Sequence, residues 1–166
     1  MNRVILFRGF HPDENGPQEI TLNGKKIRGK WVEGDFCRPG NIITEEIGYD
    51  PAFEQDHVPI FCDYDVIPET LGQYINIDDK NGKKIFESDA FCMEDDMTAV
   101  IIFKDGSFRL QVYGLTGAFT ESGYDECGGG YGVIECEPVD WFYINDMRVI
   151  GNIFSNPELL ESEGRA

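Results

Sequence analysis

The chain has 166 residues, of which 41% are hydrophobic and 13% aromatic, so it is long enough for one domain or two small ones with a true core. This apolar content excludes wholesale disorder. Its 31 acidic residues against 14 Lys and Arg give a formal net charge of −17, and because a field of that sign repels a phosphate backbone, direct nucleic-acid binding is disfavoured.

The N-terminal part of the chain predicts short strands. Val4–Arg8 is expected to form the first one. Asn23-Gly24 is the strongest short-range hairpin signal, since both residues tolerate the positive φ of a tight turn. We therefore expect Ile20–Leu22 to pair with Lys26–Arg28, or with the strand that continues to Phe36.

A loop and an edge strand are expected next. Residues Arg38 to Asp56 are rich in Pro, Gly and acids, which predicts a loop. His57–Phe61 is a short extended run that contains Pro59, and a proline suits an edge strand or a strand end.

A helical turn and a second hairpin follow. Pro68-Glu69-Thr70 predicts a single helical turn, because proline is tolerated in the first position and an acid is favourable near the N-terminal dipole. Tyr74–Ile77 alternates, Asn81-Gly82 supplies a tight turn, and Lys84–Phe86 leads back.

The third hairpin is the best defined. Ala99–Phe103 and Phe108–Tyr113 flank Asp105-Gly106, a third tight-turn signal. The alternation places Phe108, Leu110 and Val112 on one face and Arg109 and Gln111 on the other.

The C-terminal part is less regular. The glycine-rich segment Tyr113–Cys136 predicts a surface loop. Pro138–Asn145 is compatible with a buried strand or a short helical or irregular element, and we favour the latter. Met147–Phe154 predicts a last strand that closes a barrel, and Asn156 followed by Pro157 predicts the start of a short amphipathic C-terminal helix.

Four segments, in order, resemble the YopX-like family of phage and prophage proteins. They are Phe7-Arg8-Gly9, Gly29–Asp35 (GKWVEGD), Asp65–Asp89 (DVIPETLGQYINIDDKNGKKIFESD) and Val149–Leu160 (VIGNIFSNPELL). The resemblance implies a mainly-β protein, with an N-terminal β module in residues 1–64 and a C-terminal SH3-like barrel in residues 65–166.

The chain departs from the family pattern in two places. The loop at residues 38–56 looks like an insertion. Ser88 stands where the family usually has Gly, so a positive φ at that position carries a steric cost or changes the turn.

Clusters of acidic residues are candidate cation sites. The densest are the Glu87–Asp89 pair and the Glu94-Asp95-Asp96 run, and the turn Asp78–Gly82 superficially resembles a calcium loop. The turn fails that pattern, because Ile77 falls at the first ligand position and the required glutamate is missing. Solvated turn acids are the favoured interpretation, with adventitious calcium as the alternative.

Cysteine and histidine chemistry finds little support. Cys37, Cys62, Cys92, Cys127 and Cys136 contain no C-x-x-C pair, and His11 and His57 lie far from the closest cysteines, so zinc is disfavoured. A His57–Cys62 nucleophile pair is formally possible, but its spacing carries no family meaning. We expect the cysteines to be buried and reduced in a cytosolic protein, because no signal peptide or membrane span is evident.

Enzyme signatures are likewise missing from the sequence. There is no G-x-S-x-G elbow, and Gly128–Gly130 is not followed by the Lys and Ser/Thr of a phosphate loop. We therefore nominate no catalytic, cofactor-binding or metal residue, and expect a non-enzymatic protein that needs no cofactor.

Surfaces are the remaining route to function. The aromatic residues Trp31, Tyr74, Phe86, Phe108, Trp141, Phe142, Tyr143 and Phe154 are expected mainly in the core, with the remainder at a subunit interface. The expected function is protein–protein contact with self-association as a homo-oligomer. The alternatives are an acidic DNA-mimic decoy that inhibits a host DNA-binding protein, and a hydrolase or metal-dependent enzyme with an unrecognised site.

Overall fold

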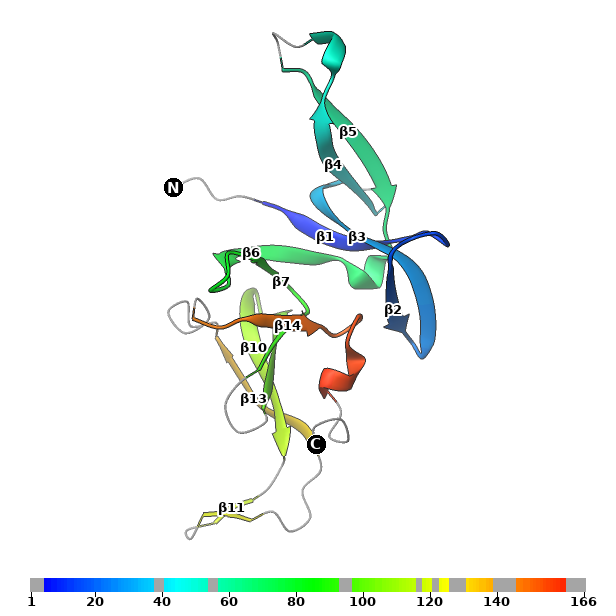
Figure 1. Ribbon diagram of the computed structural model, residues 1–166. Helices are drawn as coiled ribbons and strands as arrows, with labels where there is room; N and C mark the ends of the chain where they lie inside the picture. Colours follow the sequence, from blue (N-terminus) through cyan, green and yellow to red (C-terminus); the bar gives the residue numbers. More distant parts are fainter. Residues whose placement is uncertain are drawn as a thin grey trace. The chain divides into compact units, whose positions relative to one another are not determined.

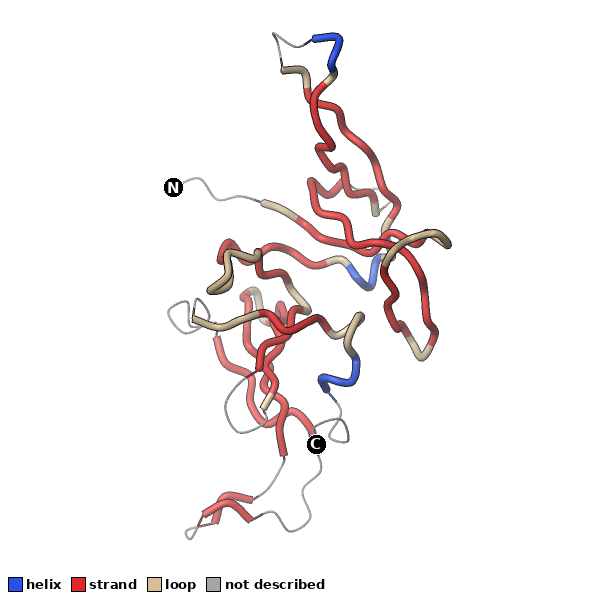
Figure 2. Tube along the Cα trace, in the orientation of Figure 1, coloured by secondary structure: helices blue, strands red, loops and turns tan. Residues whose placement is uncertain are grey.

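The computed structural model describes residues 5–37, 41–53, 57–92, 97–115, 118–120, 123–125, 131–138 and 146–160. These residues are mainly β, as predicted, with short 3-10 turns as the described helical elements (Figure 2). No helix within these ranges is long and apolar enough to cross a membrane. The chain forms two compact units, residues 1–74 and residues 75–166.

The elements of the first unit are β1 (Phe7–Pro12), β2 (Gln18–Leu22), β3 (Lys25–Cys37), β4 (Ile42–Tyr49), η1 (Pro51–Phe53), β5 (Pro59–Asp65) and η2 (Pro68–Thr70). Strand β6 (Gly72–Asp78) begins in this unit and continues into the second. The elements of the second unit are β7 (Lys84–Phe86), β8 (Asp89–Cys92), β9 (Thr98–Lys104), β10 (Ser107–Leu115), β11 (Ala118–Thr120), β12 (Gly123–Asp125), β13 (Tyr131–Pro138), β14 (Val149–Asn152) and η3 (Pro157–Leu160).

The first unit is one antiparallel sheet in the order β5-β4-β3-β1-β6, with β2 added to β3 (Figure 1). The hairpin at Asn23-Gly24 is confirmed: both residues have positive φ, 50° and 73°, and Leu22 lies opposite Lys25. Strand β1 starts later than predicted, at Phe7. The turn at η2 is also confirmed.

Close backbone approach explains the glycines of the GKWVEGD segment. A Cβ added to Gly34 would lie 2.0 Å from the carbonyl oxygen of Thr44, and one added to Gly29 would lie 2.1 Å from that of His11. The chain therefore needs glycine where neighbouring backbone passes. Between these points Val32 packs with Ile43 and Val66 in the first core.

The prediction of a loop across residues 38–56 is wrong for residues 42–49. Strand β4 occupies Ile42–Tyr49 and pairs with both β3 and β5. The reason is that Ile43 is fully buried in the first core, and its β-branched neighbours favour an extended backbone despite the adjacent acids. Strand β5 starts at Pro59, as expected for a strand end.

The second unit contains a five-stranded sheet in the order β13-β10-β9-β8-β14 and the β6–β7 hairpin. The turn at Asp105-Gly106 is confirmed, with φ of 54° and 79°, and so is the predicted alternation, since Leu110 and Val112 are buried and Phe108 packs against them. The core also takes Ile75, Ile85, Phe91, Ala99, Ile101 and Val149.

Several C-terminal expectations change. Residues 131–136 of the predicted loop lie in β13 (Tyr131–Pro138), which pairs with β10. The described strands form an open sheet, with β13 and β14 at its two edges, so a closed barrel is not confirmed; Val149 joins the core through side-chain packing and pairs only with β8 among the described strands. The C-terminal helix is a four-residue 3-10 turn at Pro157–Leu160. Residues 139–145 lie outside the described ranges.

The junction between the units belongs structurally to the first one. Val66 and Leu71 pack in the first core, and Gly72 and Gln73 pair with β1. The compact units accordingly divide after Tyr74. Whether they are independently folding domains with a boundary at 64/65 stays a prediction.

Candidate functional site

The most unusual surface of the described residues is the hairpin formed by β4, η1 and β5, residues 42–65, which we call the arm. Pairing between β3 and β4 ends at Thr44, so beyond that point β4 pairs with β5 alone. Figure 1 shows the two strands leaving the rest of the first unit as a ribbon. The arm bears these exposed large apolar side chains: Ile47, Tyr49, Phe53, Val58, Ile60 and Phe61.

The register places apolar groups on both faces of the arm. Tyr49 lies opposite Pro59, and Phe61 follows two residues along on the same face. Val58 and Ile60 lie on the other face. A two-stranded ribbon has no second layer of its own, so both faces remain open to a partner.

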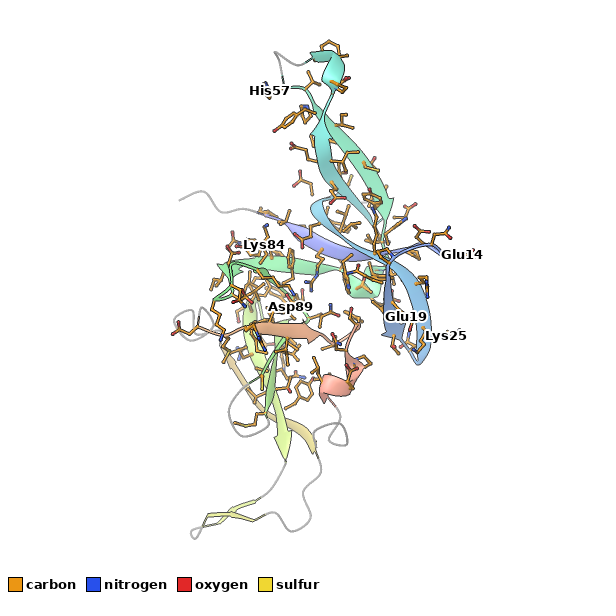
Figure 3. All side chains as sticks on the ribbon, in the orientation of Figure 1. Glu14, Glu19, Lys25, His57, Lys84 and Asp89 are labelled. Carbon is orange, nitrogen blue, oxygen red and sulfur yellow. The ribbon has the colours of Figure 1, made fainter. Side chains whose placement is uncertain are left out.

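Local backbone geometry defines the outer end of the arm. The register shifts between Glu46 and Gly48, which leaves Ile47 in a bulge. At the tip, Asp50 accepts a hydrogen bond from the Ala52 N–H at 2.9 Å through Oδ1. His57 is exposed near the outer end (Figure 3), and its ring lies 5.6 Å from that of Tyr49.

The base of the arm is fixed to the first unit by polar as well as apolar contacts. The Lys30 ammonium lies 3.9 Å from the centre of the Tyr64 ring, and a hydrogen bond that Lys30 donates to the Tyr64 side chain raises the pKa of Lys30. His11 Nδ1 lies 2.7 Å from the Asp65 carbonyl oxygen. These contacts tie the base of the arm to β1 and β3.

The arm is also strongly acidic. Its seven acids are Glu45, Glu46, Asp50, Glu54, Asp56, Asp63 and Asp65, and it contains no Lys or Arg. A surface that is both apolar and anionic favours a partner that is apolar and cationic.

Four cations gather at one edge of the second unit, in what we call the lysine turn: Lys80, Lys83, Lys84 and Arg148. All four side chains are exposed, and Figure 3 labels Lys84 beside the β6–β7 turn. The Lys80 N–H donates to the Met147 carbonyl at 3.0 Å, which brings residue 148 next to the turn. None of the four takes part in an ion pair recorded for the residues that the structure describes.

Asp79 holds the lysine turn together. Its carboxylate, only 4% exposed, accepts hydrogen bonds from the N–H groups of Asn81 at 2.8 Å and Lys83 at 3.0 Å through Oδ1. Oδ2 accepts one from the Val149 N–H at 3.1 Å. Burial acts to raise the pKa of Asp79, but these backbone donors outweigh it and the pKa is lowered. The aspartate that resembled a calcium ligand is therefore engaged with backbone.

The other carboxylates considered for cation binding also contact backbone. Asp89 is buried, and its Oδ2 accepts a hydrogen bond from the Phe86 N–H at 2.9 Å. Glu87 Oε1 accepts one from the Phe103 N–H at 3.3 Å. Among the described residues, no group of three or more His, Cys, Asp or Glu side chains is placed to hold a metal ion. The run Glu94-Asp95-Asp96 lies outside the described ranges.

The prediction that the cysteines are buried is wrong for the three whose exposure the structure describes. Cys37 and Cys92 are exposed and Cys62 is intermediate. Cys37 and Cys92 are the last residues of β3 and β8, where the core no longer covers the strand. The structure brings no described imidazole into contact with the Cys62 thiol, and Cys127 lies outside the described ranges.

The prediction that the aromatic residues pack mainly in the core holds for Phe86 and Phe108, but it missed the exposed aromatic side chains of the arm. Phe86 is fully buried, Phe108 packs against the second core, and Trp31 lies between Phe10, at a ring distance of 5.3 Å, and the Arg8 guanidinium. Residues 141–143 lie outside the described ranges. The exposed aromatics of the arm were overlooked because Tyr49 and Phe53 lie in a segment predicted to be a loop, and Phe61 lies at the end of a predicted edge strand.

The C-terminal motif serves turn geometry. Asn152 Oδ1 accepts hydrogen bonds from the N–H groups of Phe154 at 3.0 Å and Ser155 at 2.9 Å. A Cβ on Gly151 would lie 2.3 Å from the Asn156 Oδ1 atom, so this position admits only glycine without a shift. The motif thus encodes a folded turn.

Comparison with protein families supports the resemblance that the sequence motifs indicate. A family model described as YopX protein matches residues 7–161. No curated protein matches the chain. The match takes in the arm, the lysine turn and the C-terminal turn, and the chain therefore belongs to the YopX family.

Proposed function

We propose that this protein works through protein contacts rather than catalysis, and that its copies self-associate through the arm. One observation carries the proposal: of eight exposed large hydrophobic side chains among the described residues, six lie on the arm. Exposed apolar groups that gather on one element are a mark of an interaction site, whereas scattered ones are not.

The apolar groups of the arm are large enough to drive association. Phe61 is 56% exposed, which for an aromatic side chain of about 200 Å² leaves about 110 Å² to bury. At about 25 cal/mol per Å² this corresponds to at most about 3 kcal/mol. A few such contacts are sufficient to offset the entropic cost of association.

The roles of the family motifs support the non-enzymatic half of the proposal. The polar side chains of these motifs accept hydrogen bonds from nearby backbone N–H groups, as Asp79, Asp89 and Asn152 do. A catalytic carboxylate would instead need an accessible oxygen aimed at a substrate.

Sedimentation velocity over a range of concentrations tests self-association. The Phe61→Ser variant is expected to raise the dissociation constant by about tenfold or more. Phe103→Ser is the matched control, because Phe103 is exposed to a similar extent, 53%, but lies on β9 of the second unit. A monomeric wild-type protein, or equal effects of the two substitutions, would refute the proposal.

A second candidate is the acidic decoy that inhibits a host DNA-binding protein. The specific observation in its favour is the absence of Lys and Arg from residues 42–65, against seven acids. A decoy would compete with a DNA duplex for a basic DNA-binding protein, and raised salt would release the complex. If the protein self-associates but does not displace a DNA duplex from such a DNA-binding protein, the decoy hypothesis is wrong.

The finer expectations that follow from the resemblance are also proposals. The packing of the β6–β7 hairpin over the second sheet supports an SH3-like arrangement for the second unit. The phage or prophage origin and the cytosolic location stay predictions.

A further inference from the structure

We infer that the arm of one copy docks on the lysine turn of a second copy. This inference rests on the proposed self-association and names the surface that receives the arm. Two features carry it: the opposite charges of these surfaces, and apolar groups on each of them.

The charge argument begins with a difficulty. Copies with a net charge of −17 repel one another, and an arm with seven acids and no cation would oppose a second arm most strongly. An interface between two arms is therefore disfavoured. The arm needs a receiving surface with an excess of cations.

The lysine turn provides that excess. Lys80, Lys83, Lys84 and Arg148 are exposed there, and the exposed acids on the same segments are Asp78 and Asp146. Asp79 is buried and keeps its negative charge, because backbone donors and the nearby Lys83 favour the ionised form. Four cations against three acids leave a local surplus of one positive charge, on a chain whose net charge is −17.

The other basic segment of the chain is neutralised. Lys25, Lys26 and Arg28 lie at the β2–β3 hairpin, but Lys26 forms an ion pair with Glu19 at 2.8 Å. Asp13 and Glu14 line the same shallow hollow as Lys26 and Arg28. Three cations therefore meet three acids, and this surface offers the arm no electrostatic advantage over its surroundings.

The lysine turn also offers apolar contact. Met147 and Ile77 are partly buried beside it and pack against the second core. Lysine side chains contribute aliphatic stems while their ammonium groups stay in water. An arm face carrying Tyr49 and Phe61 can pack on these groups while its acids meet the ammonium groups.

The predicted contact is heterologous, because the arm and the lysine turn are different surfaces. Each copy then presents one donor and one acceptor, and association proceeds head to tail into rings or open chains. This differs from a two-fold dimer, in which the same patch of both copies is used. The difference can be measured by mixing two defective variants.

The experiment compares charge reversal at two basic sites in the full chain. Lys80→Glu with Lys84→Glu alters the lysine turn, and Lys25→Glu with Arg28→Glu is the control with the same change in net charge. Sedimentation velocity is expected to show at least about tenfold weaker association for the first pair and less than about twofold for the second. Circular dichroism melts verify folding, and Lys80→Gln with Lys84→Gln provides a milder variant with the same expected direction.

Mixing supplies the decisive measurement. The Phe61→Ser variant keeps an intact lysine turn, and the Lys80→Glu, Lys84→Glu variant keeps an intact arm. Each variant alone should associate at least about tenfold more weakly than wild type, but the mixture should form a one-to-one dimer that grows no further, because one intact interface remains.

The outcomes separate this inference from the proposed function. Equal weakening by the two charge-reversal pairs, or a mixture that stays monomeric, overturns the inference while self-association stands. A wild-type chain that is monomeric at about 100 μM, so that any association is weaker than about 5–6 kcal/mol, overturns both.

Discussion

Asp79 offers the sharpest test of how the lysine turn is built. Its carboxylate accepts three backbone hydrogen bonds, two through Oδ1 and one through Oδ2. Hydrogen bonds to a charged group contribute about 1.5–3 kcal/mol each, and removal of the carboxylate also removes its desolvation cost. We therefore expect Asp79→Ala to lower the free energy of unfolding by about 3–5 kcal/mol.

Asp79→Asn separates the two oxygens. The amide retains an acceptor for Asn81 and Lys83 but turns an N–H₂ group toward the Val149 N–H, so one bond is lost and two donors face each other. The expected loss is about 1.5–3 kcal/mol. Asp146→Ala, at an exposed position, is the control and should stay within about 0.5 kcal/mol of wild type.

Urea unfolding followed by circular dichroism measures these differences, and amide hydrogen exchange locates them. In Asp79→Asn the Val149 amide should exchange faster while the Asn81 and Lys83 amides keep their protection. Equal losses for the Ala and Asn variants, or losses under about 1 kcal/mol for both, would refute the assigned hydrogen bonds.

The pH dependence follows from the same geometry. Because the pKa of Asp79 is lowered from its ordinary 3.8, its stabilising contribution is fully present above that ordinary value and is lost as the pH falls through the folded-state pKa. The stability difference between wild type and Asp79→Asn should therefore be constant from about pH 5 to 7 and shrink below about pH 4.

Three further substitutions test the fold. Ser88→Gly should stabilise the protein by about 0.5–1 kcal/mol in urea unfolding, because Ser88 has a φ of 72° and relief of about 1–2 kcal/mol exceeds the added chain entropy; a loss of stability would contradict this. Thr70→Val removes the 2.9 Å bond from the Phe10 N–H to a buried hydroxyl and should cost about 1–3 kcal/mol, whereas Thr70→Ser should cost clearly less. In Gly29→Ala the added Cβ would lie 2.1 Å from the His11 carbonyl oxygen. We expect this substitution to lower the free energy of unfolding by about 1–3 kcal/mol. An unchanged melting temperature would show that the strands can move apart without cost.

Local sequence signals predicted the hairpins because their geometry is set within a few residues. Asn23-Gly24 and Asp105-Gly106 adopt the positive φ values that their side chains tolerate, and the flanking strands follow in register. At Ser88 the sequence left two outcomes open, a strained positive φ or a changed turn, and the structure has a φ of 72°. In these hairpins a turn of two residues sets the register of the flanking strands, so the local sequence is sufficient to predict them.

The candidate site was visible only in part. The acidity of residues 42–65 can be counted in the sequence, but that acidity itself suggested a loop. Nothing local shows that Ile43 enters the first core while Phe61 stays exposed. The lysine turn likewise depends on the Asp79–Val149 hydrogen bond, which joins residues seventy positions apart.

The sequence by itself determined the β class, the tight turns, the family and the sign of the charge. Tertiary structure decided that residues 42–49 are a strand, that residues 131–138 have a partner, and that the second sheet is open among the described strands. The physical reason is that a strand satisfies its backbone hydrogen bonds with a distant segment. Its existence and the exposure of its side chains therefore depend on which neighbour the fold supplies.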